Sequence, residues 1–167
     1  LIYSQNLVAQ KKTEILDSIF HLRNLANDEN TVINHKLTYA IEAYKLSEKT
    51  RIDSTILMSG RVLSYMYAIN DDFENYRFYN QKNLKLATKL KDTSALAIVN
   101  QHLAYYHYSK TNHDSAYYYY YNSLKYYVFL NDLQNQVDIL YAMADMQETE
   151  KDYAGSEKNA VQALKLL

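Results

Sequence analysis

The five histidines are the side chains of this chain that most readily bind a metal ion or move a proton near neutral pH. They are His21, His35, His102, His107 and His113. A helical zinc site usually places two histidines four residues apart, as in the pattern HExxH, and neither the spacing nor the pattern occurs. His102 and His107 are five residues apart, so they would diverge by roughly 140° around a helix. The histidines therefore predict no metal site.

The other groups that could do chemistry are equally unpromising. Asp71 and Asp72 form a carboxylate pair, but they stand before an expected helix, where acids stabilise the helix dipole. The serines lack a nucleophile-elbow motif, and the chain has no cysteine. Only two glycines occur, Gly60 and Gly155, whereas phosphate-binding loops need several together. The sequence predicts a protein that is not an enzyme and uses no cofactor.

The scarcity of turn-forming residues indicates which elements must position the remaining side chains. The 167 residues include no proline, and tight β-hairpins usually require glycine or Asn-Gly. Apolar residues recur at steps of three and four, which is the helical period. We therefore expect an all-α chain, with helices at about 5–27, 33–50, 54–70, 73–90, 93–110, 114–130, 133–150 and 153–167.

The expected turns recur at a fixed interval. Asp72-Phe73, Asn112-His113 and Asp152-Tyr153 each pair a helix-capping residue with an aromatic ring, and they are 40 residues apart. Three further sets of residues keep the same step: the large Leu63, Leu103 and Met143; the small Ser64, Ala104 and Ala144; and the pairs Tyr44-Lys45, Leu84-Lys85, Leu124-Lys125 and Leu164-Lys165. Such recurrence is typical of repeat proteins.

Each repeat is interpreted as a pair of helices. The small residues would let two helices approach closely, while their large neighbours interdigitate around the contact. One such hairpin cannot bury its apolar face alone, so the hairpins are expected to stack as a solenoid. The predicted organisation is a single domain over 1–167, with repeats at about 10–52, 53–92, 93–132 and 133–167, the first of them degenerate.

These marks resemble the tetratricopeptide repeat (TPR). Its pattern places a large and then a small residue in the first helix, and alanines with an aromatic residue in the second. The fourth repeat matches with Met143-Ala144 and with KDYAGSEKNAVQAL. The step of 40 residues exceeds the family's 34, and the closing proline is missing, which longer helices would explain. HEAT and armadillo repeats share the period and remain a minor alternative.

The resemblance implies a right-handed superhelix of about four hairpins, whose first helices line a concave groove that binds protein or peptide. Long arrays of this kind are similar to those of bacterial sensor kinases and transcription regulators. An extended or helical peptide with a basic residue would suit the groove. The groove positions that the family implies here are Met58, Arg61, Tyr65, Ile69, Ile98, Gln101, Tyr105, Tyr108, Asp138, Tyr141, Asp145 and Glu148.

A block of five tyrosines, Tyr117–Tyr121, cannot lie entirely in a core, because five helical residues cover more than a full turn. The repeat register predicts Tyr117 and Tyr120 to point inward and Tyr118 and Tyr121 to point outward. Two interpretations follow. Either the tyrosines only replace Phe and Leu as apolar filler, with their hydroxyls reaching water at the boundary, or the outward pair forms a convex contact patch for a protein partner or a second copy of the chain.

The remaining features argue against nucleic acid and a membrane as direct partners, and they leave an alternative function open. The net charge of −1 argues against direct contact with nucleic acid. No apolar run is long enough to span a membrane. The chain starts at Leu1, so we expect a piece of a longer protein. The last helix is apolar at Val161, Leu164, Leu166 and Leu167 and no polar capping helix follows it, which supports the same expectation. The alternative function is therefore a sensing or dimerisation segment of a bacterial regulator, with the compartment, cytoplasm or periplasm, left open.

Overall fold

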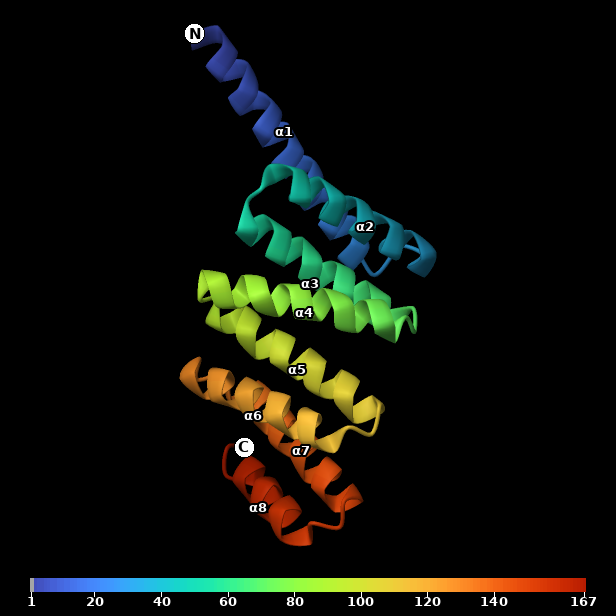
Figure 1. Cartoon of the computed structure of the whole chain (residues 1–167), viewed down its shortest axis with the longest axis vertical. Helices are drawn as coiled ribbons and strands as arrows, with labels where there is room; N and C mark the ends of the chain where they lie inside the picture. The colour runs from blue at the N-terminus through green and yellow to red at the C-terminus, as the bar shows by residue number, and fades with distance from the viewer. Residues whose placement is uncertain (1) are drawn as a thin grey trace. The chain divides into compact units, whose positions relative to one another are not determined.

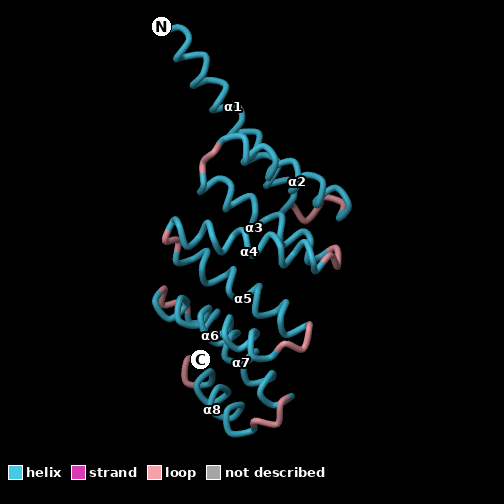
Figure 2. Tube along the Cα trace, viewed as in Figure 1, coloured by secondary structure: helices cyan, strands magenta, loops and turns pink. Residues whose placement is uncertain are grey.

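The computed structural model describes residues 2–167, with side chains from Gln10 onward, and this described part is built from eight α-helices (Figure 1). The helices are α1 (Ile2–Asn27), α2 (Ile33–Thr50), α3 (Asp53–Ile69), α4 (Phe73–Leu90), α5 (Thr93–Ser109), α6 (His113–Phe129), α7 (Leu133–Thr149) and α8 (Tyr153–Leu164). Residues 2–167 contain no strand, as Figure 2 also shows. The predicted all-α class is confirmed, and all eight predicted helices are present with only small shifts at their ends.

Very short turns connect most of the helices (Figure 2). In each of six turns one residue adopts a left-handed conformation, and these residues are spaced 20 apart: Arg51, Asp71, Lys91, Thr111, Asn131 and Lys151. In the last five turns, the next residue donates its backbone N–H to a carbonyl five residues earlier, at 2.8 to 3.0 Å. This is the Schellman arrangement that closes a helix C-terminus.

The residue that closes one helix also opens the next. Asp72, Asp92, Asn112, Asp132 and Asp152 each accept a hydrogen bond from a backbone N–H three residues later, at 2.9 to 3.2 Å. A side-chain oxygen at this position satisfies a free N–H at the start of the helix. The capping roles predicted for Asp72, Asn112 and Asp152 are thus confirmed, and Asp92 and Asp132 cap their helices in the same way. These caps explain how the chain turns without proline or glycine.

The chain divides into two compact units, Leu1–Leu86 and Ala87–Leu167, which are described separately. In the first unit a core cluster joins α1, α2 and α3 through Ala26, Tyr44, Leu63 and Met66. Tyr79 of α4 stacks on Tyr67 of α3, with ring centroids 5.4 Å apart, and meets Tyr44 of α2 edge-on at 5.1 Å. Three aromatic rings therefore hold three consecutive helices together.

In the second unit one core cluster contains Ala104, Tyr120, Tyr127 and Met143, from α5, α6 and α7. A second cluster contains Val137, Leu140 and Ala163, from α7 and α8, with Leu124 of α6 packed against it. Leu124 thus lies where one hairpin packs on the next, which fits the predicted stacking of hairpins.

The predicted alternation of large and small residues is confirmed by burial. Ser64, Ala104 and Ala144 are all buried, as are their large neighbours Leu63, Leu103 and Met143. Among the second-helix leucines, Leu124 is half-buried, whereas Leu164 is exposed. Consecutive helices pack against one another within each unit, as expected for stacked hairpins. The predicted single domain over 1–167 and the handedness of the superhelix stay predictions.

Candidate functional site

A surface on α5 and α7 carries most of the groove residues predicted from the sequence. Both helices lie in the second unit, and their exposed positions repeat at steps of three and four, so they share one face. We call this surface the tyrosine–acid face. It comprises Gln101, Tyr105 and Tyr108 of α5 with Asp138, Tyr141, Asp145 and Glu148 of α7, all exposed or partly exposed.

One hydrogen bond joins the two helices across this face. The hydroxyl of Tyr108 donates to Oδ2 of Asp145 at 2.8 Å, between residues 37 positions apart in the chain. A hydrogen bond with Thr149 lowers the pKa of Tyr108, but the bond to Asp145 and burial raise it, and the net shift is upward. Tyr108 therefore stays a donor at neutral pH and holds the Asp145 carboxylate in place.

Contacts beneath the tyrosine–acid face fix α5 on α6. The hydroxyl of Ser123 donates to the backbone carbonyl of Ala97 at 2.8 Å, in a buried position. The hydroxyl of Tyr127 donates to Oε1 of Gln101 at 2.9 Å. Gln101 is thus oriented from below, which leaves its amide nitrogen available as a donor on the exposed face.

Charge is distributed unevenly among the helices of the second unit. Neither α5 nor α7 contains a lysine or arginine, and α7 contains Asp138, Asp145 and Glu148. The second helix α6 carries Lys125, and α8 carries Lys158. The tyrosine–acid face is therefore negative and presents the exposed rings of Tyr105 and Tyr141.

The other predicted groove residues lie in separate surroundings. Met58 and Tyr65 of α3 are exposed, and Arg61 beside them is partly exposed, in the first unit. Ile69 packs against the core of that unit, and Ile98 packs against the core of the second unit, so both isoleucines are partly used in packing. Their role in ligand binding stays a prediction.

The predicted groove residues include none from the first repeat, which was expected to be degenerate. In the structure α1 is a helix that contacts α3 within the first unit. Ser18, His21 and Leu25 lie 40 residues before Met58, Arg61 and Tyr65, and Ser18 and His21 are exposed. The 40-residue step alone could have extended the predicted face to α1.

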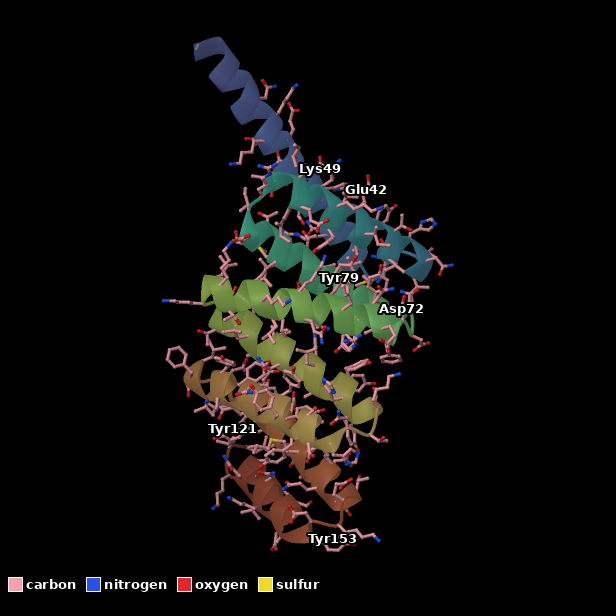
Figure 3. The ribbon with its side chains drawn as sticks, in the orientation of Figure 1. Glu42, Lys49, Asp72, Tyr79, Tyr121 and Tyr153 are labelled. Atoms are coloured by element: carbon pink, nitrogen blue, oxygen red, sulfur yellow. The ribbon has the colours of Figure 1, made fainter. Side chains whose placement is uncertain are left out.

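The structure confirms three of the four orientations predicted within the tyrosine block. Tyr120 is buried, Tyr119 is half-buried, and Tyr118 and Tyr121 are exposed (Tyr121 is labelled in Figure 3). The inward orientation predicted for Tyr117 is wrong, because its side chain is exposed. Tyr117 lies at the start of the second turn of α6 and lines a shallow hollow near the end of α7, instead of entering the core.

That hollow, of about 330 Å³, brings together several ionisable side chains of the second unit. His113 at the start of α6 faces Glu150 at the end of α7 through its Nδ1 atom, and Asp114 and Asp152 lie nearby. Across the described side chains, no three His, Asp or Glu residues are placed to hold a metal ion. His107 stacks on Tyr119, with ring centroids 5.3 Å apart, so it acts as a packing residue.

Buried tyrosines make the stability sensitive to high pH. Burial raises the pKa of Tyr120 to about 12 and also raises the pKa values of Tyr44, Tyr67 and Tyr119. The unfolded value is about 10, so between these values the folded state holds more protons than the unfolded state. Stability should therefore be intact below pH ~10 and fall as pH rises toward 12.

Urea denaturation from neutral to alkaline pH would measure this loss. Tyr120→Phe should weaken the pH dependence, because it removes one phenol that must ionise. Tyr153→Phe is the control, since Tyr153 is exposed at the start of α8 (labelled in Figure 3) and should leave the dependence unchanged. A free energy of unfolding that stays constant above pH ~10 would contradict the burial of these rings.

Comparison with known proteins supports the fold. The crystal structure of BtubC (BKLC) from P. vanneervenii matches with a TM-score of 0.73 and 14% sequence identity, covering 95% of this chain and 72% of that chain. At this identity the likeness concerns the all-helical, repeat-like fold alone. No protein-family model matches the sequence, and no curated protein sequence matches it. Each helix in the described part of the chain is too short or too polar to cross a membrane.

Proposed function

We propose that this protein is a non-catalytic scaffold that binds an extended or helical peptide through the tyrosine–acid face. The observation that carries the proposal is the pairing of exposed tyrosines with acids on two helices that lack lysine and arginine. Rigid aromatic rings supply contact area at low entropic cost, and carboxylates select a basic side chain. The favoured ligand is therefore a peptide with lysine or arginine beside an apolar residue.

We also propose that the hairpins are tetratricopeptide-like repeats of a long form. The 40-residue register of large and small residues supports this assignment, as does the buried position of Ser64, Ala104 and Ala144. In such an array the first helices form the ligand-binding side, and α5 and α7 are first helices. The assignment thus agrees with the placement of the proposed peptide site.

A peptide library that varies charge and apolar content would test the proposed binding by fluorescence anisotropy. Basic peptides should bind, and Tyr105→Ala should weaken binding about tenfold, which corresponds to about 1.4 kcal/mol. Tyr153→Ala is the control, because Tyr153 is also an exposed tyrosine but lies on α8. Equal affinity of acidic and basic peptides, or equal losses in both variants, would overturn the proposed site.

The exposed tyrosines of α6 favour a second candidate function. Tyr118 and Tyr121 lie outside the tyrosine–acid face, and peptide binding there gives them no role. They suit a sensing or dimerisation segment of a larger bacterial regulator. In that role two copies of the protein would associate through this chain. Peptide binding without any self-association would reject this second candidate.

A further inference from the structure

The exposed side of α6 carries residues at alternating steps of four and three. They are Asp114, Tyr118, Tyr121, Lys125 and Val128, which we call the α6 seam. This spacing is the one by which two helices pair along a narrow stripe. All five side chains are exposed, with Tyr118 at 62%, Tyr121 at 51% and Val128 at 54%, and Phe129 beside them is 78% exposed.

Comparison with the neighbouring repeats shows that packing does not require these aromatic residues. The position of Tyr121 is occupied by Gln81 in α4 and by Val161 in α8, and the position of Phe129 is occupied by Lys89 in α4. Tyr118 corresponds to Phe78 and Lys158. Gln81, Lys89 and Lys158 show that the helix forms with polar residues at these positions, so packing of the hairpins does not account for the exposed aromatic residues of α6.

The aromatic part of the seam is held in place by its neighbours. Tyr118 meets Tyr119 edge-on, with centroids 5.2 Å apart, and Tyr119 stacks on His107 of α5. The Nζ atom of Lys125 lies 5.8 Å from the ring centroid of Tyr121. Rings that are already ordered lose little conformational entropy when a partner covers them.

We propose that the α6 seam pairs with the same seam of a second copy, with the two helices antiparallel. Asp114 lies at the N-terminal end of the seam and Lys125 lies toward its C-terminal end. A two-fold axis between Tyr118 and Tyr121 brings Asp114 of each copy opposite Lys125 of the other, and Tyr118 opposite Tyr121. A parallel pairing would instead place like charges together.

This pairing surface is self-complementary, as a two-fold interface requires. It deepens the dimerisation candidate above and is independent of peptide binding, because its residues lie on α6 and those of the tyrosine–acid face lie on α5 and α7. The Tyr105→Ala variant should therefore lose peptide affinity and still form the dimer.

Light scattering over a dilution series tests the seam by molar mass. The wild-type chain should approach twice the monomer mass, and Tyr121→Glu should remain monomeric, because the charge would be buried against a ring. Val161→Glu is the matched control, since Val161 holds the same repeat position on α8 and is also exposed. It should dimerise like the wild type. A monomeric wild type, or a dimer lost equally in Val161→Glu, would overturn the proposal.

Charge exchange tests the antiparallel orientation separately. Asp114→Lys and Lys125→Asp should each weaken the dimer at least tenfold, since each places like charges together twice. The double variant restores opposite charges across the interface and should recover most of the affinity. Circular dichroism would verify that α6 remains helical in each variant. A double variant weaker than both single variants would overturn the antiparallel pairing.

Discussion

Replacing Leu140 by alanine should lower the free energy of unfolding by about 2–5 kcal/mol. Leu140 is 0% exposed and lies in the cluster with Val137 and Ala163, where α7 packs on α8. The change removes buried apolar atoms and leaves a cavity that fixed helix axes cannot close. Leu124 of the preceding hairpin packs against the same cluster, so the loss should also loosen hairpin stacking.

Leu133→Ala is the matched control for this prediction. Leu133 lies on the same helix but is 47% exposed, so its truncation should change stability by less than ~0.5 kcal/mol. Urea denaturation followed by circular dichroism measures both variants. Similar losses in the two variants would show that α7 does not pack on α8 as described.

Gly60→Ala should lower stability by about 1–3 kcal/mol, although alanine is the better helix former. Gly60 lies within α3, and a Cβ atom there would come 2.3 Å from Oδ1 of Asn83 and 3.3 Å from a ring carbon of Tyr44. Both neighbours are buried, so neither side chain can move away without disturbing the core of the first unit. The close approach of α3 to α2 and α4 therefore requires glycine.

Gly155→Ala provides the control at the chain's other glycine. A Cβ atom there would also approach within 2.1 Å of side-chain atoms, but these belong to the ends of Asp152 and Gln147 near the surface. Moving Asp152 would break its cap on the backbone N–H of residue 155, at a cost of about 0.5–2 kcal/mol, whereas alanine gains about 1 kcal/mol of helix propensity. The net loss should therefore stay below about 1 kcal/mol, less than that expected for Gly60→Ala. Thermal melts of the two variants would compare them directly. A Gly60→Ala protein that melts with the wild type would contradict the close helix contact.

The sequence was sufficient to predict the helices because their ends are marked in it. Asp72, Asp92, Asn112, Asp132 and Asp152 each close one helix and cap the next, so the 40-residue step is visible in the turns. The small residues that allow helix contact are also recognisable by type. The left-handed turn positions are occupied by residues other than glycine, so the scarcity of glycine did not prevent the turns from forming.

The surfaces were harder to predict. The Tyr108–Asp145 hydrogen bond joins two helices whose side-by-side placement follows only from stacking of hairpins. The buried face of α6 follows Ala116, Tyr120, Ser123 and Tyr127. Tyr117 lies roughly 90° around the helix from the middle of that face, so the three-residue spacing from Tyr120 does not bring its ring inside. The α6 seam could not be predicted from the sequence, because only the exposure of each side chain distinguishes its tyrosines from the buried tyrosines of the same block.

Nuclear magnetic resonance of the labelled chain, titrated with a peptide that contains arginine and an apolar residue, tests the proposed function most directly. We expect shifts at the amides of α5 and α7, around Tyr105, Tyr141 and Asp145, and these shifts should weaken as salt screens the acidic side chains. Shifts confined to α6 and α8, or no shifts at saturating peptide, would contradict the claim that the tyrosine–acid face is the binding site.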